Sequence, residues 1–289
     1  MPETRRTATS CAMRMAVNRR GGARLQQIVV EARSLQHSYG GVQAVRGMDI
    51  GVGQGEMIGL IGPNGAGKST VIECISGCVR GFSGQILLYG VDISKWSTFK
   101  IARAGLLRTF QTPRLFRRMS VLSNLMLAAE QGTVEGMGST LLGKWRRRDA
   151  ERLSQCLDVL DRFGLRAIAD NAASDLSGGQ ERLVELCRIL LSKPKVVLLD
   201  EPFAGVSPEN RHRLAEAIGE LRASGSTLLM VEHRLEWVER LCDRVVVMAQ
   251  GREIAAGAMD EIRANEEVVL SYLGTKSHPL PSTTEGKGA

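Results

Sequence analysis

The strongest constraint on the fold of this chain is a glycine-rich segment between an apolar run and an amphipathic pattern. Residues 57–61 before it are apolar enough for a buried strand, and the apolar positions after it share one face of a helix. The segment fits the pattern G-x-x-x-x-G-K-[ST], which binds phosphate groups when it joins a strand to a helix. It consists of Gly62, Pro63, Asn64, Gly65, Ala66, Gly67, Lys68, Ser69 and Thr70.

Each residue type in this segment suits a nucleotide phosphate chain, so we expect all nine residues to contact ATP. Glycines let backbone amides surround phosphate oxygens, and the start of the following helix adds partial positive charge. Lys68 would reach the terminal phosphates and assist hydrolysis, while the Ser69 hydroxyl would ligate Mg²⁺. A purely structural glycine-rich turn is the alternative, which only a second, independent motif can exclude.

That second motif is a pair of adjacent carboxylates at the end of an apolar run. Asp200 and Glu201 directly follow residues 196–199, which are typical of a buried strand. Neighbouring strand residues point to opposite faces, so such a pair ordinarily marks a turn or a solvated strand end. After a phosphate-binding loop each acid gains its own role: Asp200 would bind nucleotide and hold Mg²⁺, and Glu201 would accept a proton from the attacking water.

Short apolar runs alternate with helix-like segments through most of the chain. The runs at 57–61, 196–199, 227–231 and 245–248 are typical of strands buried on both faces of a sheet. The alternation predicts an α/β fold with a mainly parallel sheet. Two helical stripes are expected, one of Val71, Ile72, Ile75, Cys78 and Val79, the other of Leu183, Leu186, Cys187, Leu190 and Leu191 before Pro194.

The chain divides into a central domain and two tails. Residues 25–274 form the expected domain, and within it residues from about 92 to 175 lack convincing strands. We expect these to be an inserted helical subdomain, with helices at 121–130 and 149–163. Residues 1–24 are predicted to be a basic disordered tail, and the polar residues 275–289 a second disordered tail.

Charge and hydropathy limit the kinds of molecule that this chain is expected to bind. The net charge is +7, but six arginines against one acid in residues 1–24 account for +5 of it, which leaves a nearly neutral body. With 4% aromatic residues, that body gives little support to nucleic-acid binding. No segment approaches the roughly 18 uninterrupted apolar residues of a membrane span. The six cysteines show no metal-ligand spacing, so we expect buried thiols in a reducing cytoplasm.

A third motif, Leu176-Ser177-Gly178-Gly179-Gln180, identifies a class. Alone it would be a helix start, with Ser177 as the capping residue. Together with the other two motifs it makes the chain resemble the nucleotide-binding subunit of ABC transporters over about residues 28–274. The resemblance implies a P-loop NTPase (RecA-like) core with a mainly parallel sheet, an N-terminal antiparallel β part and an inserted helical subdomain.

The resemblance also implies roles for single residues. Tyr39 matches the aromatic residue that stacks on adenine, and Gln111 the glutamine that contacts nucleotide and Mg²⁺. Ser177, Gly178, Gly179 and Gln180 match the signature, which binds the ATP held by the phosphate loop of a second ATP-binding subunit in a head-to-tail dimer. His233 matches the switch histidine of catalysis. On residues alone, Tyr39, Gln111 and His233 would more often be structural.

Further residues indicate a subgroup. The segments 108–111, 114–116, 119–121, 201–208, 261–265 and 272–274 resemble those of branched-chain amino acid importers, a group that includes amide and urea importers. This implies a peripheral protein on the cytoplasmic face of the membrane, with integral-membrane permease subunits and, indirectly, a solute-binding protein as partners. Permease contacts are expected around Gln111 and residues 114–130, where Arg114, Arg117 and Arg118 could equally be solvated charges.

Some residues depart from the general ABC pattern, and other functions stay open. Residues 204–207 read Ala-Gly-Val-Ser where Ser-Ala-Leu-Asp is common, Ser123 replaces a common Glu, and Arg234 replaces a common Asp. Lipopolysaccharide-export ATPases are close relatives and form the main alternative. A soluble ABC ATPase would usually carry two nucleotide modules or a coiled coil, and a non-hydrolytic P-loop protein would not need Glu201 and His233.

Overall fold

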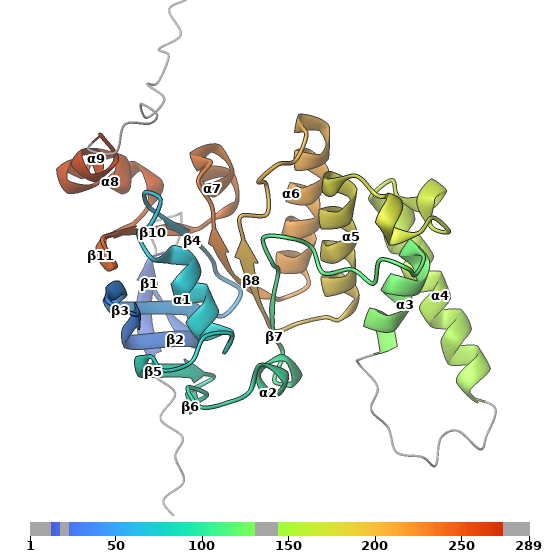
Figure 1. The fold of residues 1–289 in the computed structure, drawn as a ribbon, viewed down its shortest axis with the longest axis horizontal. Helices are drawn as coiled ribbons and strands as arrows, with labels where there is room; N and C mark the ends of the chain where they lie inside the picture. Colours follow the sequence, from blue (N-terminus) through green and yellow to red (C-terminus); the bar gives the residue numbers. More distant parts are fainter. Residues whose placement is uncertain (1–12, 18–22, 131–143, 274–289) are drawn as a thin grey trace, which may run out of the picture. The chain divides into compact units, whose positions relative to one another are not determined.

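The chain forms two compact units in the computed structural model, which describes residues 13–17, 23–130 and 144–273 (Figure 1). The first unit comprises the described residues up to Gly53, then Ile58–Lys95 and those from His233 onwards. The second unit comprises Gln54–Met57 and Trp96–Glu232. Each unit contains both strands and helices, so the α/β class predicted from the sequence is confirmed.

An antiparallel sheet makes up part of the first unit. The long strand β2 pairs with β1, β3 and β5, and β6 continues from β5. This is the antiparallel N-terminal part that the resemblance implied. Its strands are β1 (Met13–Val17), β2 (Ala23–Tyr39), β3 (Val42–Gly53), β5 (Ser83–Leu88) and β6 (Val91–Asp92).

Within the described residues, the rest of the first unit contains the strand that leads into the phosphate loop, two further strands and four helices. The fully buried β4 (Met57–Ile61), which belongs to this unit from Ile58 onwards, pairs in parallel with β10 (Arg244–Ala249), and β11 (Arg252–Gly257) pairs with β10 in antiparallel register. A Cβ at Gly59 of β4 would lie 2.7 Å from Val238 Cγ1, so the absence of a side chain lets a helix pack closely. The unit's helices are α1 (Lys68–Ile75), α7 (Leu235–Leu241), α8 (Met259–Ala264) and α9 (Glu266–Leu273).

The second unit combines three parallel strands with helices. Strand β8 (Val196–Asp200) pairs in parallel with β7 (Leu106–Arg108) and with β9 (Thr227–Val231). Both β8 and β9 are buried along their whole length, as predicted for core strands. The helices are α2 (Thr98–Arg103), α3 (Val121–Glu130), α4 (Lys144–Arg162), α5 (Gly178–Leu191) and α6 (Pro208–Ala223), with short 3₁₀ turns at Arg166–Ile168 and Ala173–Asp175.

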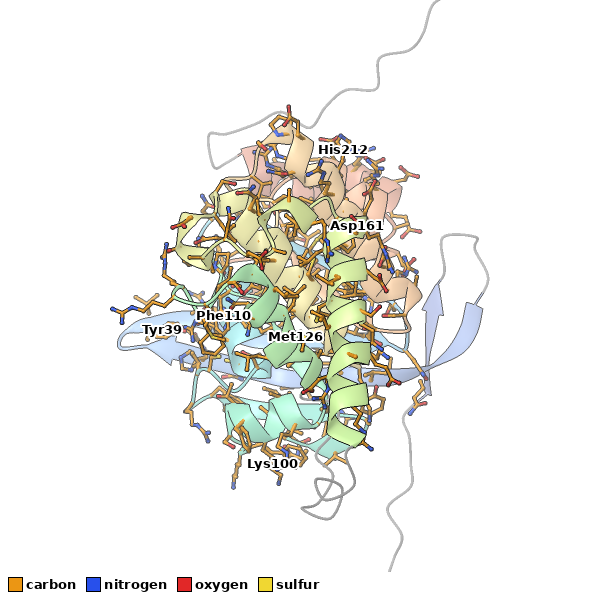
Figure 2. All side chains as sticks on the ribbon, turned by 90° about the vertical axis from the view of Figure 1, so that its right-hand side faces the viewer. Tyr39, Lys100, Phe110, Met126, Asp161 and His212 are labelled. Atoms are coloured by element: carbon orange, nitrogen blue, oxygen red, sulfur yellow. The ribbon has the colours of Figure 1, made fainter. Side chains whose placement is uncertain are left out.

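Helices α3, α4, α5 and α6 of this unit pack against one another. Helix α5 contacts α3, α4 and α6, and α3 also contacts α4; Figure 2 shows α3 and α4 side by side, with Met126 and Asp161 labelled. The buried side chains Leu183, Leu186 and Cys187 hold α5 in place, as the predicted stripe requires. Among the helices in the described residues, none is both long enough and apolar enough to cross a bilayer.

Three details differ from the sequence predictions. Residues 13–17 and 23–24, placed in a disordered tail, are strand in β1 and β2, because backbone pairing between them does not require an apolar pattern. The helical segment contains the short strand β7, which is only three residues long and therefore gives little periodicity. Helix α1 ends at Ile75, since Gly77 adopts a left-handed φ of 70°. Cys78 and Val79 therefore lie beyond the helix rather than on the predicted stripe, and Cys78 is exposed.

The remaining predictions for helices, strands and thiols hold where the structure describes them. Helix α3 has the predicted bounds, and α4 begins five residues before the expected start. Cys74, Cys156, Cys187 and Cys242 are buried, while Cys11 lies outside the described residues. Burial raises the pKa of Cys156 to about 11, which keeps this thiol protonated and unreactive near neutral pH.

Candidate nucleotide-binding and hydrolysis site

The loop between β4 and α1 has a backbone that only glycine can adopt at two positions. Gly62 has a φ of 148° and Gly67 a φ of 98°. A Cβ at Gly62 would overlap the carbonyl oxygen of Met248, and one at Gly67 would overlap that of Ala44. By contrast, a Cβ at Gly65 would meet nothing within 4 Å, so this part of the loop borders open space. The glycines therefore shape the loop against its own unit and leave its other side open.

Lys68 is the first residue of α1 and is folded back over the loop. Its Nζ donates hydrogen bonds of 2.8 Å to the carbonyl oxygens of Gly62 and Pro63, and the residue is only 5% exposed. A buried ammonium group held by neutral carbonyls is a positive centre inside the loop. Ser69 beside it is exposed at the start of the helix.

These residues fit a Mg²⁺-bound triphosphate. The loop has an open side, a fixed cation and a helix start whose capping residue, Gly67, provides no side chain to bond the first amides. The exposed Ser69 hydroxyl is the hard oxygen ligand that Mg²⁺ prefers. In the described residues no three His, Cys, Asp or Glu side chains cluster as a metal site.

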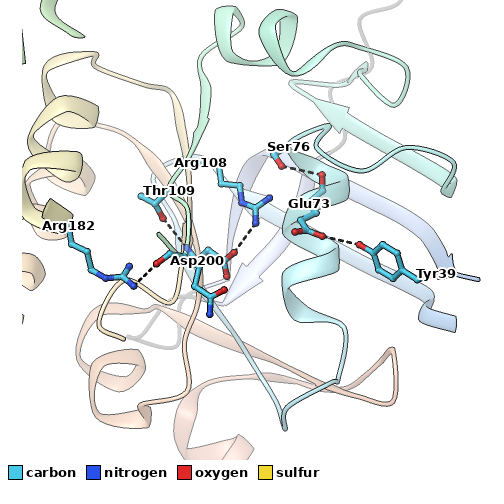
Figure 3. A network of polar contacts seen from close by, with 8 residues as sticks. Tyr39, Glu73, Ser76, Arg108, Thr109, Arg182 and Asp200 are labelled. Carbon is cyan, nitrogen blue, oxygen red and sulfur yellow. Dashed lines mark hydrogen bonds and ion pairs between the residues drawn. The ribbon is translucent and has the colours of Figure 1, made fainter. Parts of the chain in front are cut away.

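Tyr39 lies at the end of β2 and is attached to α1. Its hydroxyl donates a 2.9 Å hydrogen bond to Glu73 Oε2, as Figure 3 shows, and its ring meets His37 edge to face with centroids 4.6 Å apart. Partial burial, followed by the bond to Glu73, raises the pKa of the Tyr39 hydroxyl. The residue is still 48% exposed, so a ligand can reach part of this aromatic side chain.

Asp200 at the end of β8 is held by Arg108 and Thr109, to which the sequence alone assigned no role. Its carboxylate forms a 2.9 Å ion pair with Arg108, and both side chains are under 10% exposed. Its backbone N–H donates a 3.0 Å hydrogen bond to the Thr109 hydroxyl. Parallel pairing of β7 with β8 brings these residues together across 92 positions of sequence (Figure 3). The segment from Arg108 to Gln111 was the one sign in the sequence that these residues matter, although it does not show that Asp200 is their partner.

Glu201 follows with a strained backbone. Its φ of 47° is left-handed, which is unfavourable for a residue with a long side chain. Its N–H still donates a 2.9 Å hydrogen bond to the Val231 carbonyl of β9. The turn therefore ends β8 at this residue. Lys193 and Gln250 have the same φ of 47°, so this backbone conformation by itself assigns no role to Glu201.

The predicted signature forms the start of α5. Ser177 is the N-cap: its hydroxyl accepts a 3.4 Å hydrogen bond from the Gln180 N–H, while Gln180 Oε1 accepts one of 2.9 Å from the Ser177 N–H. The expected capping role of Ser177 is thus confirmed. Ser177 and Gly178 are exposed, and Gly179 packs against Asn210. The exposed helix start has the free amides that an anion would need.

Other expected residues are placed as follows. Gln111 is exposed, and its carbonyl oxygen accepts a 2.7 Å hydrogen bond from Arg182 of α5. His233 is exposed directly after the buried Glu232. The second unit therefore brings Asp200, Gln111 and the signature helix into one hydrogen-bonded region, and the first unit brings Tyr39 to the helix that starts at the phosphate loop.

Comparisons with known proteins identify the family. Residues 45–204, more than half of the chain, match the family described as ABC transporter. The chain belongs to the ABC transporter family. The prediction from the three motifs is therefore confirmed, as is the fold expected for an ABC cassette.

Several characterised ABC proteins are similar over nearly their whole length. The high-affinity branched-chain amino acid transport ATP-binding protein LivG of Escherichia coli (strain K12) is 38% identical over 253 residues, covering 86% of this chain and 99% of LivG. BraF of Pseudomonas aeruginosa, which has the same descriptive name, is 35% identical over 251 residues, covering 85% and 98%. The crystal structure of an ABC cassette in its ADP conformation superposes with a TM-score of 0.71 at 34% identity, covering 86% of this chain and 99% of that one.

Two of the residues that depart from the general ABC pattern form local hydrogen bonds through their backbone groups. Ser123 takes part in a hydroxyl network at the start of α3, where its N–H donates to Ser120 Oγ at 3.1 Å. In the segment 204–207, the Val206 carbonyl accepts a 2.8 Å hydrogen bond from Arg211 Nε. Because these contacts use the backbone N–H of residue 123 and the backbone carbonyl of residue 206, they do not depend on the side chain at either position.

Proposed function

We propose that this chain is the ATP-binding and ATP-hydrolysing subunit of a transporter that imports branched-chain amino acids, or related amides and urea, through separate permease subunits. The observation that carries the proposal is the full set of three motifs on the expected strand and helix ends of an ABC cassette. The cargo part rests on the names of LivG and BraF, which match this chain over nearly their whole length.

In this proposal ATP binds to the loop from Gly62 to Thr70 of the first unit, with adenine on the ring of Tyr39. Lys68 would bind the terminal phosphates, since its ammonium group already lies inside the loop. Ser69, Gln111 and Asp200 would hold Mg²⁺, which neutralises phosphate charge during hydrolysis. Asp200 is then shared between the cation and Arg108.

Glu201 and His233 would carry the proton transfer and the recognition of the terminal phosphate. Glu201 lies directly after Asp200, at the carboxyl end of β8 where α/β proteins bind ligands. As a general base it would accept a proton from the attacking water. His233 would hold the phosphate and the water in position, in keeping with its exposure at a strand end.

Two cassettes would form a head-to-tail dimer, either from two copies or with a sister subunit. Ser177, Gly178, Gly179 and Gln180 of each would contact the ATP bound by the other, using the exposed start of α5. ATP binding would close the dimer by adding contacts to both halves, and hydrolysis would remove them. Permease subunits would receive this movement at the cytoplasmic face of the membrane.

Purification of the tagged chain from its native membranes tests the proposal. We expect two multispanning permeases and a second ATPase to co-purify, and the complex to hydrolyse ATP when it is supplied with a branched-chain amino acid and its solute-binding protein. Co-purification with an envelope-lipid export complex would instead favour the alternative, a lipopolysaccharide export ATPase. Recovery without any membrane protein would contradict a role in transport.

A further inference from the structure

Three side chains on one face of α5 hold the backbone of the loop that contains Gln111. Arg182 donates a 2.7 Å hydrogen bond to the Gln111 carbonyl, and Arg188 donates one of 2.7 Å to the Arg114 carbonyl. Between them, Glu185 accepts a 3.4 Å hydrogen bond from the Arg114 N–H. Positions 182, 185 and 188 are spaced by three residues and so share one side of the helix. We call these three residues the α5 clamp.

Glu185 is the centre of the α5 clamp. It is 7% exposed, and it also accepts a hydrogen bond from the Phe110 N–H. Burial raises the pKa of Glu185 to about 7, although the bonds from Arg114 and Phe110 and the charges of Arg182 and Arg188 act in the opposite direction. A carboxyl group is costly to bury, and here its oxygens are directed at loop amides. Glu185 therefore contributes contacts to the loop that an apolar residue could not make.

The same loop is fixed on its other side to the end of β8. Arg108 pairs with Asp200, and Thr109 accepts a hydrogen bond from the Asp200 N–H while its own N–H donates to Leu198. Phe110 follows Thr109 directly, and its N–H already bonds to Glu185 of α5. The centroid of its ring is 5.3 Å from the guanidinium carbon of Arg108 and 3.8 Å from that of Arg114. This leaves very little free chain between the two attachments.

We propose that Glu185, flanked by Arg182 and Arg188, is a positioning residue that fixes Gln111 to α5. Movement of the exposed Ser177 end of α5 is then passed to Gln111 through the helix and the α5 clamp. In the dimer proposed above, Ser177 contacts the ATP of the partner and Gln111 contacts the ATP of its own subunit. The clamp therefore links the two ATP sites, and this use of it rests on the proposed function.

Hydrogen exchange of the isolated full-length chain tests whether the clamp holds the loop. We expect Glu185→Ala to accelerate exchange of the amides at 110 and 114 by about tenfold, the effect of losing a buried hydrogen bond. Glu220→Ala is the matched control, because Glu220 pairs with Arg162 at 2.6 Å on other helices of the same unit. Unchanged exchange at 110 and 114 in Glu185→Ala would overturn the proposal.

Kinetics of the assembled transporter test whether the clamp acts through Gln111. Glu185→Ala should lower kcat about 10- to 100-fold, the cost of misplacing a reacting group, with the KM for ATP changed less than about twofold. Glu185→Gln keeps one acceptor oxygen, fills the same space and should give an intermediate kcat. In a Gln111→Ala background, Glu185→Ala should cause no further loss.

A loss of equal size in both backgrounds would overturn the positioning role, because it would mean that Glu185 acts independently of Gln111. Glu185→Gln is also the control for misfolding, because it fills the same space as glutamate. It should lower kcat in the same direction as Glu185→Ala. If the wild-type complex hydrolysed no ATP, the proposed function would fail and with it the use of the clamp. The exchange measurement would still decide whether the clamp itself exists.

Discussion

Removal of Arg108 should destabilise the cassette far more than removal of an arginine from an exposed ion pair. Arg108 and Asp200 are 2.9 Å apart with side chains 8% and 6% exposed. Deleting one partner of a buried pair leaves an uncompensated charge and typically costs about 3–5 kcal/mol. For a domain of this size each kcal/mol lowers the midpoint of thermal unfolding by about 2–4 °C. Taking the lower value of about 3 kcal/mol, we expect Arg108→Ala to lower Tm by roughly 6–12 °C.

Arg162 provides the control for this prediction. It pairs with Glu220 at a shorter distance, 2.6 Å, but the two side chains are 54% and 31% exposed. Because water screens this pair, Arg162→Ala should cost less than about 1 kcal/mol. Thermal and urea unfolding followed by circular dichroism measure both variants. A Tm for Arg108→Ala no lower than that for Arg162→Ala would refute the argument from burial.

A double variant separates the charge from the packing of Arg108. Asp200→Asn removes the stranded charge, so Arg108→Ala combined with Asp200→Asn should be more stable than Arg108→Ala alone. Mg²⁺ and ATP should also restore part of the lost stability of Arg108→Ala, since the cation would take the place of the guanidinium beside Asp200. If the double variant were the less stable of the two, packing rather than charge would be the cause.

Four further predictions concern the loop, the acids and pH. Glu201→Gln should slow ATP turnover by roughly 10²–10⁴-fold with unchanged ATP affinity, and wild-type turnover would contradict its role as base. Lys68→Ala should weaken ATP binding measured by calorimetry, and an unchanged affinity would contradict the phosphate site. Gly62→Ala should prevent correct folding because the added Cβ would overlap the Met248 carbonyl oxygen. At Gly65 the added Cβ would meet open space, so Gly65→Ala should lower the free energy of unfolding by only about 1 kcal/mol, the cost of its positive φ. The pKa of Glu185 in the folded state, about 7, lies above its unfolded value, so protonation of Glu185 stabilises the fold at low pH. This contribution to the free energy of unfolding is lost as pH rises from about 4.5 to 7. Glu185→Gln should remove that pH dependence from free energies measured by urea unfolding, and a variant with the wild-type dependence would contradict the shift in pKa.

Local motifs allowed much of the site to be predicted from sequence. The phosphate loop, the acidic pair and the capping role of Ser177 each depend on residues within a few positions of one another. Their chemistry follows from local backbone geometry, which is why the strand before Gly62 and the helix after Lys68 occur where expected. The resemblance to the ABC family depended on the same short segments.

Contacts between distant segments could not be predicted in this way. The ion pair of Arg108 with Asp200 requires the parallel register of β7 and β8, and β7 is too short to show a periodic pattern. The hydrogen bond from Arg182 to the Gln111 carbonyl, and the one that Glu185 accepts from the Arg114 N–H, each join residues 71 positions apart. On sequence alone these side chains read as an ordinary polar face of an amphipathic helix. Their burial and partners are properties of the packed unit.

The left-handed backbone at Glu201 implies a trade-off between stability and activity. A non-glycine residue at such a φ costs on the order of 1 kcal/mol or more, which glycine would largely avoid. The chain nevertheless has a long acidic side chain at this position, where the water must lose its proton in the proposed reaction. A Glu201→Gly variant should therefore be the more stable protein, although it would lack the proposed general base.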